Sequence, residues 1–218
     1  MRFSYWVATG IISACVCRGQ SLSIGVTGGG RPTDNVIGAT PESRRYVVGP
    51  MVELRLPWNL AVEVDALYHR NGFLTGNSNF AGSIVESERA NSWEFPMLFK
   101  YKLAVPKVKP FVEVGLAPRT ISGTISESGF AVDIMTDQRT PFSRVVRTNW
   151  NGSFGIVTGG GVQFGVGRLR LSPEVRYTHW TSAPIGGTFG DGPSYYGTQE
   201  QVDVLLGIGW RVRQSSPD

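Results

Sequence analysis

The sequence predicts an all-β protein: an eight-stranded, antiparallel, up-and-down transmembrane β-barrel with short periplasmic turns and long extracellular loops. Apolar and polar residues alternate with a period of two in eight segments, which is typical of strands with one apolar and one polar face. Most of these segments are about ten to thirteen residues long, close to the length that a tilted strand needs to cross a bilayer. The connections between them are alternately short and long, as in transmembrane barrels.

The composition agrees with a single barrel domain. The chain has 218 residues with 28 Gly, 13 Pro and 17% charged residues, and its mean hydropathy is -0.07. That mean hydropathy does not fit a helical membrane protein, and beyond residue 19 no apolar run is long enough for a spanning helix. The net charge of +4 comes from scattered basic residues without a basic run, so we expect no nucleic-acid partner.

The first 19 residues have the features of an export signal. Arg2 supplies a positive charge, residues 3–16 are largely apolar, and we expect cleavage before Gln20, which leaves a barrel domain of residues 20–218. Cys15 and Cys17 then leave with the signal; the alternative is a lipoprotein in which Cys15 is lipidated. With two His and no thiol in the mature chain, we expect no cofactor and no metal site.

The first four expected strands cover residues 21–28, 45–56, 59–70 and 92–103. Each places β-branched, aliphatic or aromatic side chains at every second position, which gives it one apolar face. In chain order, these faces contain Leu22, Ile24 and Val26; Val48, Val52 and Leu54; Leu60, Val62 and Val64; and Phe95, Met97 and Phe99.

The last four expected strands cover residues 109–119, 150–164, 168–180 and 201–212 and follow the same rule. Their apolar faces contain Val112, Val114 and Leu116; Phe154, Ile156 and Val162; Leu169, Leu171 and Val175; and Val204, Leu206 and Ile208.

The connections differ sharply in length. Short ones at 57–58, 104–108 and 165–167 alternate with long ones at 29–44, 71–91, 120–149 and 181–200. Long loops are where recognition is usually carried, so we expect an extracellular partner to bind the longest of them, residues 120–149. Pro50, Pro96, Pro110 and Pro173 lie in or beside strands, and each removes a backbone donor. Three of them directly precede alternating runs, so we expect β-bulges or strand offsets at Pro50, Pro110 and Pro173.

In a membrane barrel the apolar face meets lipid and the polar face lines the interior. The interior of an eight-stranded barrel is only wide enough for side chains to fill, so charges there must pair with one another. The expected interior charge network consists of Glu53, Arg55, Glu63, Asp65, Glu94, Lys100, Glu113, Arg119, Arg170, Glu174, Arg176, Asp203 and Arg211.

Aromatic residues gather near the two ends of the expected strands. Rings of Trp and Tyr are enriched at both membrane interfaces, so this placement predicts two aromatic girdles. The outer girdle consists of Tyr46, Tyr68, Trp93, Trp150 and Tyr177, and the inner girdle of Trp58, Tyr101, Phe164 and Trp210.

Residues 93–101 (WEFPMLFKY), 109–115 (KPFVEVG) and 171–177 (LSPEVRY) resemble the outer-membrane β-barrel family that includes the OmpA and OmpX transmembrane domains. The final strand is similar to that family's assembly signal in its order of Gly207, Trp210 and Val212, although it ends on Val212 rather than on an aromatic residue. The resemblance implies the outer membrane of a Gram-negative-type cell, contact with membrane lipid and lipopolysaccharide, and insertion by the barrel assembly machinery through the last strand. It implies no single activity, because this fold hosts adhesins, inert anchors and a few enzymes.

His179 and Thr181 raise an alternative. Some eight-stranded outer-membrane barrels are lipid A deacylases with a His and a Ser two residues apart near the outer end of a strand, and here Thr181 stands where that Ser belongs. A hydroxyl nucleophile needs a base within reach and a third group that orients the base, and the sequence does not place that third group. We therefore expect no catalytic residues and an interfacial position for His179 and His69.

The expected function is a non-enzymatic structural or surface-interaction role in the outer membrane. The alternatives are a lipid A-modifying enzyme, a narrow small-solute pore and a soluble lipocalin-like carrier, in which the apolar face would point inward.

Overall fold

A computed structural model describes residues 21–32, 36–37, 40–41, 43–79, 82–103, 105, 108–133, 135–182, 186–187 and 195–212. The predicted signal peptide, with Cys15 and Cys17, and the tail after Val212 lie outside these residues. The strands are β1 (Ser21–Gly30), β2 (Val36–Ile37), β3 (Thr40–Pro41), β4 (Tyr46–Arg55), β5 (Leu60–Asp65), β6 (Leu67–Asn79), β7 (Gly82–Glu94), β8 (Met97–Lys102), β9 (Val108–Asp133), β10 (Gln138–Val166), β11 (Leu169–Trp180), β12 (Gly186–Gly187), β13 (Tyr195–Gly197) and β14 (Glu200–Arg211).

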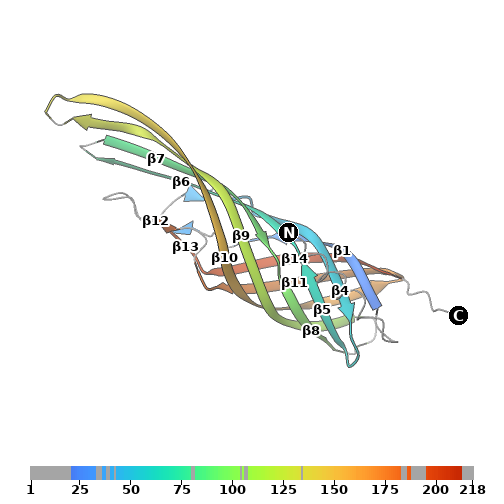
Figure 1. Ribbon diagram of the computed structural model, residues 1–218. Coiled ribbons are helices and arrows are strands. Elements are labelled where there is room, and N and C mark those ends of the chain that lie inside the picture. The colour runs from blue at the N-terminus through green and yellow to red at the C-terminus, as the bar shows by residue number, and fades with distance from the viewer. Residues whose placement is uncertain are drawn as a thin grey trace, which may run out of the picture.

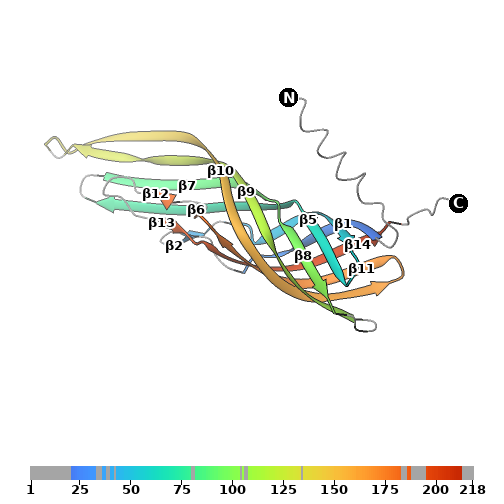
Figure 2. The ribbon, with the colours of Figure 1, turned by 60° about the horizontal axis from the view of Figure 1, so that its bottom comes forward.

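The strands close into an antiparallel ring with eight positions (Figures 1 and 2). In order around the ring they are β1, β4, β5, β8, β9, β10, β11 and β14, and β14 pairs with β1. β5 and β6 are successive segments of one strand, and both pair with β4. β7 and β8 are likewise successive segments of one strand, and both pair with β9. The predicted eight-stranded, antiparallel, up-and-down barrel is confirmed. Closure pairs both sides of every barrel strand, which is what a sheet in lipid requires.

The strand register is unchanged on both sides of Pro50, Pro110 and Pro173, so the expected β-bulges or strand offsets are absent there. A proline lacks the N–H donor but keeps its carbonyl acceptor, so it removes one hydrogen bond without displacing the strand. The N–H of Ala66, for example, still donates to the carbonyl of Pro50 at 3.0 Å. Between β9 and β10 the register does shift, but it does so between Asn151 and Ser153 of β10, away from these prolines.

Two hairpins, β6–β7 and β9–β10, project far beyond the ring at one end (Figure 1). β7 also pairs with β9 from Glu94 to Gly82, so the two hairpins form one continuous sheet. This corrects the expectation of loops at residues 71–91 and 120–149, which are largely strand. Outside lipid a strand needs no apolar face, so these segments lack the alternation that marks the spanning strands. We refer to this as the hairpin end and to the opposite end as the turn end.

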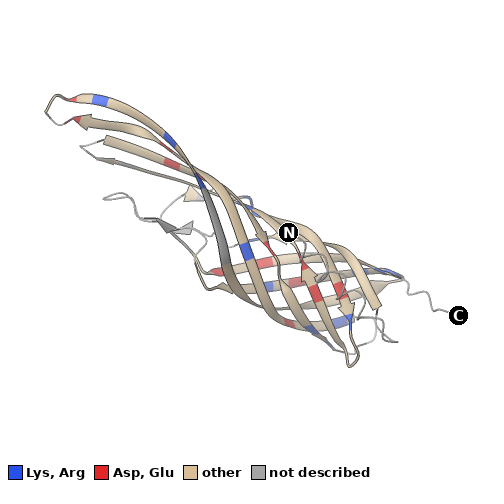
Figure 3. Ribbon diagram, in the orientation of Figure 1, with Lys and Arg blue, Asp and Glu red and all other residues tan. Residues whose placement is uncertain are grey.

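The barrel has an apolar exterior and a polar interior. Val64, Phe99 and Val112 are 44%, 62% and 63% exposed on the outer surface. Their chain neighbours Glu63, Lys100 and Glu113 are buried inside. Figure 3 shows charged residues along the barrel strands, and burial places most of them in the interior. Within the described part of the chain, no helix is long and apolar enough to cross a membrane.

A buried carboxylate without a hydrogen-bond partner lies on the inner face of the projecting sheet. Glu88 of β7 is 1% exposed, and both of its carboxylate oxygens lack a partner. Its cross-strand neighbours are Phe73 and Ile125, and Glu86 lies on the same face two residues away. Burial, followed by the negative charge of Glu86, raises the pKa of Glu88 to about 7.

An outward-facing lysine tests where the lipid lies. Val64 is midway along the spanning part of the barrel wall, and we expect Val64→Lys to lower the free energy of unfolding in lipid vesicles by about 2–4 kcal/mol. Val145→Lys is the matched control, because Val145 is 65% exposed on the projecting part of β10. Urea unfolding in vesicles measures both, and equal effects would contradict a lipid-facing exterior.

We expect the β6–β7 hairpin to lose stability as the pH rises. The pKa of Glu88 is about 7 in the folded protein and lies above the ordinary value of 4.5. The contribution of protonated Glu88 to the stability of the hairpin is therefore complete below about pH 4.5 and is lost as the pH rises through 7. Glu88→Gln should abolish this dependence and slow amide exchange in the hairpin above pH 7. Hydrogen exchange corrected for intrinsic rates measures it, with Glu127→Gln on β9 as control. A Glu88→Gln hairpin that still loosens with pH would refute the assignment.

Candidate functional site

Two cations and four carboxylates form a buried cluster in the middle of the barrel. Lys100 of β8 places its Nζ 2.8 Å from Glu63 and 3.0 Å from both Glu113 and Glu174. Arg176 of β11 contacts the same three residues and also Asp65, with distances from 2.5 to 3.1 Å. The side chains of all six residues are at most 2% exposed. We call this set the central cluster.

The central cluster connects opposite walls of the barrel. Arg176 on β11 reaches Glu63 and Asp65 on β5, and these strands are four positions apart in the ring of eight. The guanidinium presents five donors in a plane, which lets one side chain satisfy carboxylates from several strands. Buried ions that are paired in this way hold the strands in one arrangement, and loss of one partner leaves the others uncompensated.

The three glutamates of the central cluster also have the spacing of a metal site. One carboxylate oxygen from each of Glu63, Glu113 and Glu174 lies within 4.8 Å of the other two. Lys100 contacts all three, so its ammonium group supplies the positive charge that a cation would otherwise bring. The arrangement is therefore explained by an ion-pair cluster without a metal.

A glycine makes room for this cluster. A Cβ atom at Gly159 would lie 2.7 Å from the Oε1 atom of Glu113, which is the atom that accepts from Arg176. Gly161 similarly faces the Cβ atom of Glu174 at 2.8 Å. The inward-facing glycines of β10 thus leave space for the carboxylates of neighbouring strands.

A second group of paired charges lies toward the turn end. Glu53 of β4 accepts from Lys102 at 2.5 Å and from Arg170 at 2.6 Å. Gln163 of β10 accepts from Lys102 and donates to Ser172, and it is 5% exposed. One carboxylate thus holds cations from β8 and β11, which joins three walls of the barrel.

A third group closes the interior toward the hairpin end. Arg31, just beyond β1, turns inward and contacts Glu94 at 3.0 Å and Asp203 at 2.7 Å. Gln201 donates to both of these carboxylates and accepts from the indole N–H of Trp180. Arg31 is 2% exposed, so this part of the interior is occupied by side chains from the segment after β1 and from β7, β11 and β14.

Three of the residues expected in the interior network occupy other environments. Arg119 is buried but stacks on the ring of Trp180 at 3.7 Å and donates to the carbonyl of Ser182, rather than joining an ion pair among the described residues. Arg55 and Arg211 line an open cleft at the turn end together with Arg170. The other ten are buried and take part in the three groups above.

The interior also contains partners that the sequence analysis did not include. Arg31 fell in a segment expected to be a loop, so nothing in its periodicity placed it inside. Lys102, Gln163 and Gln201 lie on the polar faces of expected strands, and the position of Lys102 two residues after Lys100 was a usable signal. Gln163 and Gln201 are uncharged, so the rule that buried charges must pair does not select them.

The expected girdle residues with described side chains are exposed or partly exposed on the outer surface. At the hairpin end, Tyr68 and Trp93 pair across strands with ring centroids 5.3 Å apart. At the turn end, Trp58 is 86% exposed and adopts φ 58°, a left-handed conformation that disfavours a large side chain. The remaining expected members with described side chains are exposed or partly exposed, namely Tyr46, Tyr101, Phe164, Tyr177 and Trp210. The side chain of Trp150 lies outside the described residues.

The two histidines occupy different environments. His69 is 1% exposed inside the barrel, which corrects its expected interfacial position. His179 faces outward near the hairpin end, and its Nδ1 lies 3.0 Å from Oε1 of Glu200 on β14. The hydroxyl of Thr181 donates to the carbonyl of Phe154 at 2.9 Å. The register of β11 with β14 thus supplies the carboxylate partner that could not be placed from the sequence.

Comparison with protein-family models and with curated proteins gives no match. Among solved structures, the chain is similar to a major outer membrane protein from Thermus thermophilus, with a TM-score of 0.49 and 13% identity over 89% of this chain and 100% of that one. It is also similar to Neisserial surface protein A, with a TM-score of 0.42 and 14% identity over 90% and 97% of the two chains. The N-terminal β-barrel domain of Pseudomonas aeruginosa OprF gives a TM-score of 0.41 and 10% identity over 88% and 97%.

The architecture itself is established by the strand pairing and burial within this chain. A closed ring of eight antiparallel strands, an apolar exterior and a charged interior are the features of a small outer-membrane-type β-barrel.

Proposed function

We propose that the chain is an outer-membrane protein of a Gram-negative-type cell, exported by the signal at residues 1–19, with a structural or surface-interaction role. The apolar exterior requires a lipid environment, and closed β-barrels with such an exterior are the β-structures that span membranes. The hairpin end then faces outside the cell, and the short turns face the periplasm.

The observation that carries this proposal is that the barrel interior is filled by ion pairs, whereas two hairpins project beyond the barrel. Ion pairs link opposite walls through the interior, which favours a stable anchor over a conducting path. β6, β7, β9 and β10 carry the sheet well beyond the barrel wall (Figure 2). An extracellular partner would therefore meet a sheet surface, including residues 120–149, rather than a flexible loop.

The proposed partners follow from the same orientation. Outer-membrane lipid and lipopolysaccharide would surround the apolar wall, and the barrel assembly machinery would engage the last strand, β14. A soluble lipocalin-like carrier is disfavoured because such a barrel needs an apolar interior, whereas this interior contains charges and the apolar side chains face outward.

Extraction and electrophoresis test the proposal. We expect the full-length chain to fractionate with the outer membrane, to require detergent for release, and to migrate faster before boiling than after it, because a closed barrel resists unfolding by the detergent. A chain recovered in the soluble periplasmic fraction, with one mobility in both samples, would contradict the proposal.

A second candidate function, hydrolysis of a lipid acyl ester, is favoured by the pairing of His179 with Glu200. A carboxylate on Nδ1 holds the imidazole so that Nε2 can act as a base. His179 follows Tyr177 by two residues on the outward face of β11, and Glu200 lies opposite His179 on β14. This position is close to the level at which lipid ester bonds are expected. Against it, the Thr181 hydroxyl is bonded to a backbone carbonyl and not to the imidazole.

Fatty-acid release from lipid A by the purified full-length barrel separates the two functions. The structural role predicts no release by the wild-type chain. Release that falls by at least about 100-fold in His179→Asn and in Glu200→Gln, with the mobility shift on boiling intact, would instead establish the hydrolase.

A further inference from the structure

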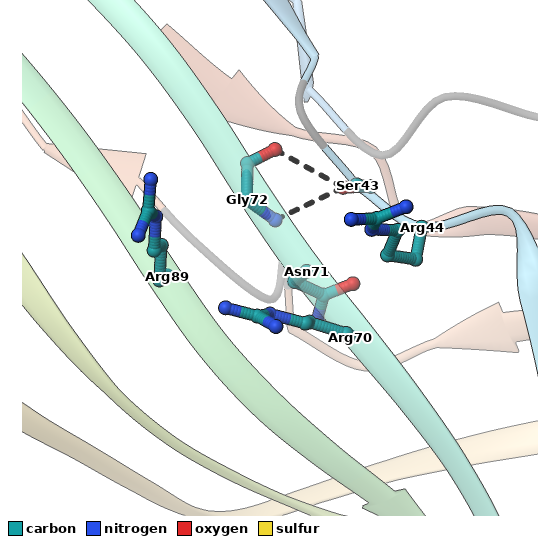
Figure 4. Close-up of a pocket in the computed structure, with 6 residues that line it drawn as sticks. All are labelled: Ser43, Arg44, Arg70, Asn71, Gly72 and Arg89. Carbon is teal, nitrogen blue, oxygen red and sulfur yellow. Dashed lines mark hydrogen bonds between the residues drawn. The ribbon is translucent and has the colours of Figure 1, made fainter.

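A cleft lined by three arginines lies beside β6 and β7, where these strands leave the barrel toward the hairpin end (Figure 4). Its volume is about 640 Å³, and its lining contains no Asp or Glu among the described residues. The lining residues are Ser43, Arg44, Arg70, Asn71, Gly72 and Arg89. The side chains of Arg44, Arg70 and Arg89 are exposed, and none forms an ion pair with another described residue.

Strand pairing holds these arginines in place. The N–H of Arg44 donates to the carbonyl of Arg70 at 3.0 Å, and the hydroxyl of Ser43 bonds both the N–H and the carbonyl of Gly72 at 3.1 Å. Arg89 of β7 lies directly opposite Gly72 of β6. Arg44 and Arg89 thus flank β6 on its two sides, and Arg70 lies on β6 between them (Figure 4). The cleft is therefore built on the paired strands β6 and β7 and on a segment before β4 that is hydrogen-bonded to β6.

The cleft lies just beyond the outer aromatic level. Arg70 follows Tyr68 by two residues on the same face of β6, and Arg89 precedes Trp93 by four on the same face of β7. At about 3.3 Å per residue, the arginines lie about 7 to 13 Å beyond the aromatic pair along the strands. Aromatic girdles mark the boundary of the acyl chains, so this is the level of lipid headgroups.

The positive charges of the three arginines indicate which kind of headgroup the cleft would bind. Guanidinium groups remain protonated at any physiological pH, and three of them around one cleft repel each other unless an anion joins them. Arginine binds phosphate through two parallel hydrogen bonds, which suits it to phosphate more than to a diffuse negative surface. At the level beyond the aromatic pair, the phosphates adjacent to the barrel wall are those of lipid headgroups.

We propose that Arg44, Arg70 and Arg89 bind the phosphate groups of a phosphorylated glycolipid headgroup in the outer leaflet. The inference rests on the proposed function, because it requires the barrel to lie in the outer membrane with its hairpin end outside. It deepens that function by assigning a site for lipid recognition to one sector of the barrel, formed by β6, β7 and the segment before β4.

Binding of diphosphorylated lipid A to the full-length barrel in phosphatidylcholine nanodiscs tests the site. We expect Arg70→Gln with Arg89→Gln to weaken binding by about tenfold or more, and removal of the lipid's phosphates to weaken wild-type binding similarly. The matched control is Arg144→Gln with Arg147→Gln, which removes the same charge from exposed positions on the projecting part of β10 and should change binding by less than about twofold.

The outcomes separate the site from the underlying function. If the wild-type chain shows no mobility shift on boiling, the outer-membrane barrel itself is refuted. If the shift is present and the Arg70/Arg89 variant binds diphosphorylated lipid A like the wild type, the site alone is refuted. If that variant loses binding of inorganic pyrophosphate in detergent but keeps lipid A binding, the cleft is a site for a soluble anion and the lipid assignment is wrong.

Discussion

The pairing of charges inside the barrel is the interaction on which the rest of the molecule depends. An eight-stranded barrel in lipid must turn its polar face inward, where the space is too narrow for bulk water to solvate ions. Lys100 and Arg176 meet this constraint by contacting carboxylates from β5, β9 and β11. The side chains of the wall are thus fixed by contacts made across the interior, and small residues such as Gly159 are required where those contacts crowd the wall.

Because paired side chains fill the interior, a ligand or partner would have to bind on the outer surface of the protein. The hairpin end offers two kinds of outer surface: the projecting sheet of β6, β7, β9 and β10, and the outward-facing residues just beyond the aromatic level. Arg70 and Arg89 occupy that second surface on one side of the barrel. His179 and Glu200 occupy it on another side, four positions away around the ring. Both groups lie just beyond the outer aromatic residues, at the level that the proposed orientation in the outer membrane assigns to lipid headgroups.

The spanning part of the fold was predictable from the sequence because lipid imposes a period-two pattern on it. Val62, Val64 and their equivalents must face outward, and Glu63 must face inward, so the strands could be read residue by residue. The projecting parts of β6, β7, β9 and β10 were read as loops because water on both faces imposes no such pattern. The site residues divide in the same way: Glu63 and Arg176 were visible, whereas Arg31 lies outside the periodic segments. The contact of His179 with Glu200 and the cleft around Gly72 depend on which residues face each other across strands, and a single sequence does not specify that register.

Removal of one cation from the central cluster is the most direct test of whether the paired interior stabilises the barrel. Lys100→Met replaces the ammonium group with an apolar side chain of similar length and leaves Glu63, Glu113 and Glu174 with one fewer partner. Lys109→Met is the matched control, since Lys109 lies in the open cleft at the turn end. Urea unfolding in lipid vesicles should show a loss of about 3–5 kcal/mol for Lys100→Met and a change under about 1 kcal/mol for Lys109→Met. Equal stability of the two variants would contradict the claim that the paired interior holds the barrel together.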